Sequence, residues 1–161
     1  MKKSLKAAIV LIVIASALTA LFACGQGGEV SGDFMTLVLT DGAEYTQTLE
    51  VDLNAMSYNE NTGLMNVLES LRLQEKLTYA ADSSAYGAFL TAVGGLTQDE
   101  RAGRYLTVYT SVEKDKGTFE AENYVYTDKN GSEVICYPSG VGVSAMTIQD
   151  GCVVVITYVT Y

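Results

Sequence analysis

MTLVLTDGAEYTQTLEVDL, residues 35–53, predicts that the fold begins with a β-hairpin. Asp41-Gly42 is a frequent turn pair, and it lies between two runs rich in Thr, Leu and Val, which favour strands. From Leu49 to Leu53, apolar residues alternate with polar ones, so one face of this strand is expected to be buried and the other wet. The buried face needs a second layer to cover it.

The covering layer is predicted by NTGLMNVLESLRLQEKL, residues 61–77, where the hydrophobic period lengthens. Leu64, Leu68 and Leu71 recur at intervals of four and three residues, and Met65 lies beside them, which is the spacing of one helix face. The stretch therefore predicts one amphipathic helix of about four turns, long enough to lie across a small sheet. Its apolar stripe is expected to belong to the core.

Polar residues mark the start and the solvent side of this helix. Asn61 or Thr62 is expected to cap the first turn by accepting a backbone N–H. Glu69 and Arg72 are spaced so that their side chains can pair on the wet side. The helix is thus predicted to begin close to residue 62.

Strand patterns return after the helix. They occupy residues 86–96, 104–112, 123–137 and 151–161. Gly94-Gly95 marks a turn in the first run, and Asn130-Gly131 predicts that the third run is a second hairpin. The last run, GCVVVITYVTY, is almost continuously β-branched and aromatic, as in a well-buried strand. The order of elements predicts an α+β fold, a β-grasp-like mixed sheet with one main helix packed on it and an inserted β-hairpin.

The front of the chain is predicted to direct export. Lys2, Lys3 and Lys6 form a positive start, and residues 7–23 are uncharged and mostly apolar, which suits the core of a signal peptide. Residues 15–17, Ala-Ser-Ala, fit an ordinary cleavage site inside this run. An uncleaved membrane anchor is a further alternative.

Leu21-Phe22-Ala23-Cys24 resembles the lipobox of bacterial lipoproteins, although Phe22 is bulkier than the residue usual at its position. The resemblance implies that Cys24 receives a diacylglyceryl group and becomes the mature N-terminus. The chain then divides into a lipoprotein signal peptide at 1–23, a lipidated cysteine with a flexible tether at 24–33, and a domain at 34–161. We expect a protein anchored by lipid to the extracytoplasmic face of a bacterial cell membrane.

Composition limits the partners. The chain has 10 basic and 19 acidic residues, and three of the basic ones lie in residues 1–23. An acidic domain of this kind is repelled by phosphate backbones and by anionic lipid headgroups. Nucleic acid is therefore excluded as a partner. The length after residue 23 suits a single domain with a modest core.

The chain has no histidine. Ser-His-Asp catalysis, Cys-His catalysis and the usual zinc sites each need an imidazole, so all three are excluded. A two-carboxylate glycosidase remains conceivable. The acids, however, are scattered through turn-like sequence such as VEKDKGTFEAEN, residues 112–123, and are expected to be solvated loop charges. We expect no catalytic activity, no metal site and no required cofactor.

Two cysteines remain once Cys24 is assigned to lipid. Cys136 and Cys152 can form a disulfide in an oxidising compartment, and closing a loop of this size contributes about 3 kcal/mol in the chain-entropy model. They can equally be two separate buried thiols. The spacing alone does not show whether their strands face each other.

Three blocks of sequence resemble the family of domains similar to the C-terminal part of transcobalamin, which occurs in lipoproteins and surface proteins of Gram-positive bacteria. The first block is the opening hairpin followed by TGLMNVLESL. The second runs from Tyr86-Gly87 to Gly94-Gly95-Leu96, and the third is GVGVSAMTIQDGCVVVITY. The resemblance implies a β-grasp-like fold that binds a soluble ligand. In the vitamin carriers this domain closes over cobalamin, so a corrinoid is the implied ligand.

The chain departs from the family pattern at several positions. The family has a tryptophan at the start of the strand that here reads RYLTVYTSV, where Tyr105 is the nearest equivalent, and Ser111 stands where Asn is expected. The final Gly-Asp becomes Gly151-Cys152, and residues 113–137 resemble an insertion. Without histidine, no imidazole can replace the lower axial ligand of cobalamin, so the corrin would be recognised by contact alone.

Two functions follow from these observations. The first is a surface-tethered module that binds a small, flat, partly apolar ligand, with cobalamin or another corrinoid as the leading choice. Tyr86, Tyr105, Tyr109 and Tyr137 would then contact the ligand, unless they pack as cross-strand pairs. The second is a protein-interaction or structural module of the cell envelope, which uses the hairpin at 122–137 to contact an envelope protein or transporter. A pocket lined by Tyr105 and Tyr109 would favour the first function.

Overall fold

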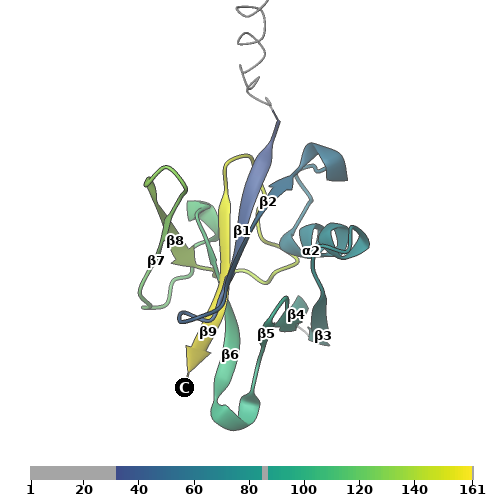
Figure 1. Cartoon of the computed structure of the whole chain (residues 1–161). Helices are drawn as coiled ribbons and strands as arrows, with labels where there is room; N and C mark the ends of the chain where they lie inside the picture. The colour runs from purple at the N-terminus through teal and green to yellow at the C-terminus, as the bar shows by residue number, and fades with distance from the viewer. Residues whose placement is uncertain (1–31, 85–86, 161) are drawn as a thin grey trace, which may run out of the picture. The chain divides into compact units, whose positions relative to one another are not determined.

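The computed structural model describes residues 32–84 and 87–160, and Gly32–Tyr161 form one compact unit (Figure 1). The predicted signal peptide, residues 1–23, and the predicted lipidation site, Cys24, lie outside the described residues. Every helix in the described part of the chain is too short or too polar to span a bilayer.

Six strands form the main sheet. They are β1 (Phe34–Thr40), β2 (Thr46–Asp52), β6 (Arg104–Thr110), β7 (Tyr124–Thr127), β8 (Glu133–Pro138) and β9 (Val153–Thr160). Their spatial order is β2-β1-β9-β6-β8-β7. β9 runs parallel to β1, and the other neighbouring pairs are antiparallel, so the sheet is mixed, as the sequence predicts.

β9 is a central strand of this sheet. It pairs with β1 on one side and with the whole of β6 on the other. Residues 153–156 are buried, because both faces of the sheet are covered there. The prediction of a well-buried strand near the end of the sequence is confirmed.

The β1–β2 hairpin is also confirmed, and its turn is stabilised by a side chain. The Asp41 carboxylate accepts the backbone N–H of Ala43 at 2.8 Å and that of Tyr45 at 2.9 Å. These bonds favour the charged form and hold the pKa of Asp41 below its usual value. Local turn chemistry is therefore enough to start the sheet.

The helix α2 spans Leu64–Leu73 and is shorter than the predicted four turns. Its buried stripe consists of Leu64, Val67, Leu68 and Leu71. It ends early because Glu75 adopts a positive φ of 57°, which turns the backbone away from the helix. The chain then leads directly into a strand.

The predicted caps of α2 are wrong. The N-terminal boundary residue is Gly63, whose N–H donates to the Asn66 side chain at 2.9 Å. The Thr62 hydroxyl accepts the N–H of Asn59 instead, at 2.9 Å. Glycine is required at position 63 because a Cβ there would overlap the carbonyl oxygen of Ser144.

The predicted pair on the wet side of α2 is confirmed. Arg72 lies 2.6 Å from Glu69, and the Tyr79 hydroxyl donates to the same carboxylate at 3.0 Å. The hydrogen bonds from Arg72 and then from Tyr79 lower the pKa of Glu69 to about 2. Tyr79 thus ties the helix to the strand that follows it.

A second, three-stranded sheet follows α2. It contains β3 (Tyr79–Ser84), β4 (Gly87–Val93) and β5 (Leu96–Thr97) in that order. The strand character of β3, with its small and polar residues, was not predicted. The predicted turn at Gly94-Gly95 is confirmed, and the Gly95 N–H donates to the Tyr45 hydroxyl at 3.0 Å.

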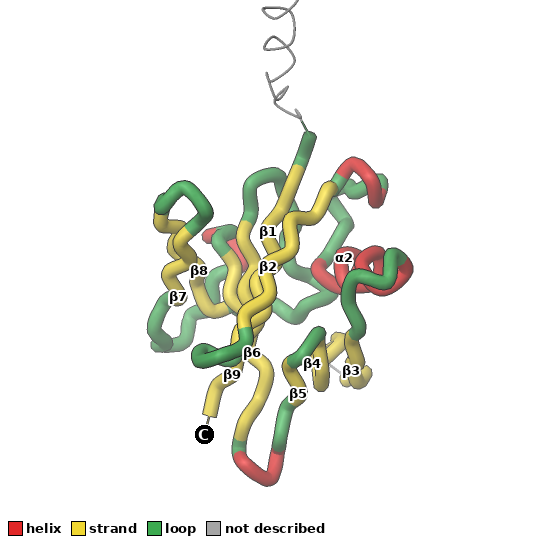
Figure 2. Tube along the Cα trace, viewed as in Figure 1, coloured by secondary structure: helices red, strands yellow, loops and turns green. Residues whose placement is uncertain are grey.

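The main core lies between the two sheets and α2. Buried side chains from one face of the main sheet pack against α2 and against Leu90, Val93 and Leu96 of the small sheet. Figure 2 shows α2 and β3 to β5 on the same side of the main sheet. Three short 3-10 helices, Asn54–Met56 (η1), Glu100–Ala102 (η2) and Glu113–Asp115 (η3), lie in connecting segments.

The inserted hairpin β7–β8 covers part of the opposite face. β8 pairs with β6 only at Pro138 and Tyr137, and beyond these residues the hairpin packs across the sheet. Tyr124, Tyr126 and Val134 pack there on a second small core formed by residues of β1, β8 and β9. The predicted fold class, with one helix on a mixed sheet and an inserted hairpin, is confirmed.

Candidate ligand-binding groove

Two adjoining hollows lie between β4, β6 and residues 139–143, and we call them together the β6 groove. The first has a volume of about 170 Å³ and the second about 480 Å³. Both are lined by Phe89 of β4 and by Leu106 and Thr107 of β6. The groove therefore lies between the small sheet and the main sheet, along the edge of β6.

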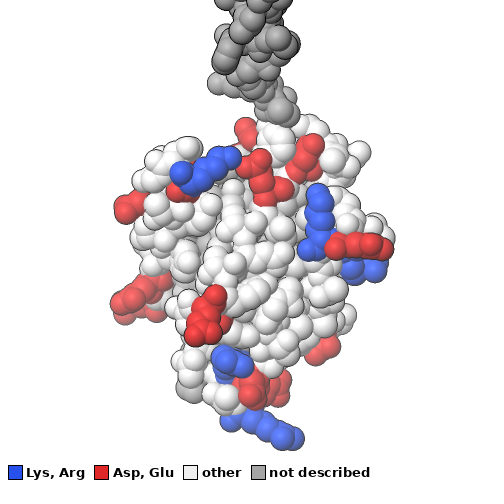
Figure 3. Space-filling model, viewed as in Figure 1, with Lys and Arg blue, Asp and Glu red and all other residues white. Residues whose placement is uncertain are grey.

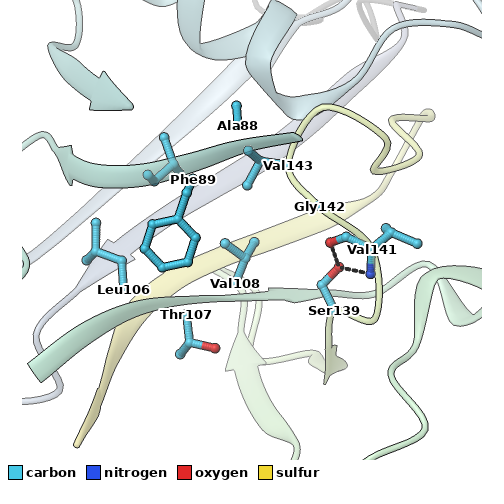
Figure 4. Close-up of a pocket in the computed structure, with 10 residues that line it drawn as sticks. Ala88, Phe89, Leu106, Thr107, Val108, Ser139, Val141, Gly142 and Val143 are labelled. Atoms are coloured by element: carbon cyan, nitrogen blue, oxygen red, sulfur yellow. Dashed lines mark hydrogen bonds between the residues drawn. The ribbon is translucent and has the colours of Figure 1, made fainter. Parts of the chain in front are cut away.

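The groove has an apolar floor with an exposed aromatic ring above it. Phe89 is 47% exposed, whereas Leu106 is only 8% exposed. In Figure 4 the Phe89 ring points toward Leu106 and Val108, and Val143 approaches from the opposite loop. An exposed ring over a preformed apolar floor offers contact area to a flat ligand.

The residues that line the groove carry no charge. Together, the two hollows are lined by Ala88, Phe89, Leu90, Tyr105, Leu106, Thr107, Val108, Ser139, Val141, Gly142, Val143 and Val159. Figure 3 shows that on one face of the molecule the charged side chains lie mainly toward the margin. The nearby Arg104 guanidinium lies 4.5 Å from the centre of the Tyr158 ring. An uncharged hollow in an acidic protein favours a neutral, partly apolar ligand.

The loop side of the groove is held by one buried carboxylate. Asp115 of η3 accepts the backbone N–H of Thr147 at 2.5 Å and the Thr147 hydroxyl at 3.1 Å. Its own carbonyl accepts the N–H of Gly140 at 2.8 Å, so both ends of residues 140–147 are fixed to η3. The prediction that Asp115 is a solvated loop charge is wrong, because its side chain is buried. No local pattern identified it, because its partner is 32 residues away.

The four predicted ligand-contacting tyrosines do not form one site. Tyr105 lines the larger hollow. Tyr109 packs beneath the inserted hairpin, with its ring 6.0 Å from that of Tyr124. The ring of Tyr137 lies 4.6 Å from the Lys116 ammonium, and Tyr86 is outside the described residues. Tyr109 lines neither hollow of the β6 groove, so the groove does not bring Tyr105 and Tyr109 together.

Sequence reasoning missed Phe89 and the 139–143 segment as groove residues. The sequence assigned no role to Phe89, although a phenylalanine at an exposed strand position is an available signal. Val141 is an exposed apolar residue in the same groove. The nearness of these two residues depends on the packing of the small sheet.

The possible disulfide between Cys136 and Cys152 is not formed, and both thiols are free and buried. Cys152 packs in the main core with Val154, whereas Cys136 packs in the second core with Val153. Because successive strand residues point to opposite faces, the sheet separates the two sulfurs. Burial raises the pKa of Cys136 to about 11 and also raises that of Cys152, so neither thiol is reactive near neutral pH.

Acidic side chains do not gather into a metal site in the part of the chain that is described. No group of three or more Asp, Glu, Cys or His residues there is placed to hold a metal ion. Apolar side chains and backbone groups are what the β6 groove offers a ligand.

Comparisons with known proteins show a likeness of fold. No family model and no curated protein matches the chain. A solved candidate metal-binding protein from Ruminococcus gnavus ATCC 29149 is similar over 80% of this chain and 98% of its own, with 18% identity and a TM-score of 0.51. Haptocorrin in complex with Cbi is similar over 81% of this chain and 26% of its own, with 11% identity and a TM-score of 0.50. The chain thus has a transcobalamin-like fold and spans about a quarter of haptocorrin.

Proposed function

We propose that this chain is a non-catalytic binding module that holds a small, flat, partly apolar ligand in the β6 groove. The observation that carries the proposal is the Phe89 ring, half exposed above the buried Leu106, in a hollow without charged walls. A large apolar ring beside a preformed, uncharged hollow offers contact area to a flat ligand. A corrinoid is the first choice because haptocorrin, which shares the fold, was solved in complex with Cbi.

The groove would cover only one side of a ligand as large as a corrinoid. Its larger hollow has a volume of about 480 Å³, and the chain corresponds to 26% of haptocorrin. A protein that buries a smaller fraction of the ligand surface binds that ligand more weakly. We therefore expect micromolar affinity, which suits capture followed by transfer to an envelope protein or transporter.

Titration of residues 29–161 with cyanocobalamin and cobinamide tests the proposal. We expect saturable binding, followed by heat and by the corrin absorption bands. Phe89→Ala should weaken it about tenfold, because the lost contact is worth roughly 1–2 kcal/mol. Tyr105→Ala should weaken it less. Phe119→Ala is the control, since Phe119 is exposed outside the groove. Equal affinity in all three variants would reject the β6 groove as the site, and no saturable binding would reject the corrinoid assignment.

The hairpin supports the alternative, a protein-interaction module. Val125 and Ile135 are directly opposite each other in β7 and β8 and are 51% and 50% exposed. Two adjacent exposed aliphatic side chains on a strand pair form a small apolar patch. A V125T/I135T double variant discriminates between the two functions. This variant should retain full ligand binding if the β6 groove is the functional site. It should lose chemical cross-links to envelope proteins on the cell surface if the hairpin is the functional site.

We also propose that the protein is anchored to the extracytoplasmic face of the membrane through lipid on Cys24. The support is the sequence from Leu21 to Cys24, together with the charged start and apolar run before it. Labelling cells with an alkyne fatty acid should mark the wild-type protein, and Cys24→Ser should lose the label and stay uncleaved. A Cys136→Ser variant is the control. Label retained in Cys24→Ser would reject the lipid anchor.

A further inference from the structure

A gap in the hydrogen bonding of β6 lies inside the β6 groove. The Ser111 N–H donates to the Val153 carbonyl of β9 at 2.9 Å. In an antiparallel pair, alternate residues bond to the same neighbour, so odd-numbered residues of β6 face β9. Even-numbered residues therefore direct their backbone N–H and C=O away from β9, toward the other edge.

Two of these even-numbered residues, one on each side of Leu106, show their partners on that edge. Arg104 exchanges both backbone bonds with Asp99, at 2.8 and 2.9 Å. The Val108 carbonyl accepts the N–H of Ser139 at 2.9 Å. Both contacts confirm the direction in which the even-numbered residues point.

Leu106 lies between these two contacts. Its N–H and C=O face the same edge, and no backbone or side-chain group within residues 32–84 and 87–160 bonds to them there. β5 does not continue alongside β6, because the N–H and C=O of Thr97 bond to the Tyr158 hydroxyl at 2.8 and 3.0 Å. Both hollows of the groove are lined by Leu106, so this residue lies beside both of them.

This gap is too short for another strand but suits a small polar group. Asp99 closes one end and Ser139 the other. Within one extended residue the N–H and C=O lie side by side and point the same way, as they do when two strands exchange a pair of bonds. A carboxamide presents a donor and an acceptor in the same arrangement. The uncharged walls favour such a neutral group over a carboxylate.

We propose that the backbone of Leu106 binds a carboxamide of the ligand, while Phe89 covers the apolar body to which that carboxamide is attached. The inference deepens the proposed function and rests on ligand binding in the β6 groove. Corrinoids carry several carboxamide side chains at their rim, so the two proposals are compatible. The gap would then select ligands by a donor and acceptor pair that no substitution except proline removes.

Benzamide and N,N-dimethylbenzamide form the test pair, because only benzamide has both a donor and an acceptor. Residues 29–161 contain the whole compact unit and both of its cores, and are labelled with nitrogen-15. We expect millimolar benzamide to shift the Leu106 N–H resonance saturably and to slow its hydrogen exchange. The dimethyl analogue should bind at least about fivefold more weakly, since it loses one hydrogen bond.

Two variants make the result specific. Phe89→Ala should weaken benzamide binding, and Phe119→Ala should not. Equal binding of both amides, or shifts that leave Leu106 unchanged, would overturn the proposal. The corrinoid titration tests a separate hypothesis. Benzamide binding without corrinoid binding would support the Leu106 site and reject the corrinoid as the ligand. Corrinoid binding that leaves the Leu106 resonance unchanged would reject only the Leu106 site and keep the proposed ligand.

Discussion

Leu68→Ala should lower the free energy of unfolding by about 3 kcal/mol. Leu68 is fully buried on the face of α2 that covers the main sheet. Its removal leaves a cavity between two layers that cannot collapse without moving the helix. Urea denaturation followed by circular dichroism measures the effect, because the chain has no tryptophan for fluorescence.

Leu73→Ala is the matched control. Leu73 lies on the same helix, and its side chain is 70% exposed. Leu73→Ala removes the same atoms as Leu68→Ala, but from an exposed position, so the free energy of unfolding should change by less than about 0.5 kcal/mol. Similar losses in the two variants would mean that α2 does not pack on the sheet through the stripe that contains Leu68.

Asp115→Ala should cost about 3 kcal/mol and loosen one wall of the groove. It removes a buried carboxylate that accepts two hydrogen bonds from Thr147, and bonds to a charged group contribute about 1.5–3 kcal/mol. It also leaves the Thr147 N–H without its acceptor. Hydrogen exchange at Thr147 should accelerate more than exchange at Leu68, because the loss is local.

Two further substitutions define the cause. Asp115→Asn retains one acceptor oxygen and should lose about half as much stability. Glu113→Ala removes an exposed charge from the same 3-10 helix and should have little effect. If Asp115→Ala behaves like Glu113→Ala, the carboxylate does not hold the loop.

Elements defined by neighbouring residues could be predicted from the sequence. The turn at Asp41 and the leucine spacing of α2 depend on residues a few positions apart, and both were predicted. The caps of α2 were not, because Gly63 is selected by its close approach to Ser144, far along the chain. Local capping preference is weaker than an overlap between backbones.

The candidate site was largely unpredictable for the same reason. Tyr105 and Tyr109 share one face of β6, so the sequence grouped them, but the inserted hairpin covers only the second of them. Asp115 and the gap at Leu106 depend on which segments come together in space. A missing backbone partner leaves no trace in residue type, since every residue except proline has the same two groups.

The position of β9 has a consequence for how the chain is made. Residues 153–160 form the strand that joins β1 to β6, so the first and last strands of the sheet are neighbours. During synthesis, β1 and β6 emerge long before the strand that lies between them. The edges of β1 and β6 stay unpaired until β9 has been synthesised, and contacts between such distant segments form slowly. A ribosome that stops before Val153 would release two half-sheets exposed to aggregation.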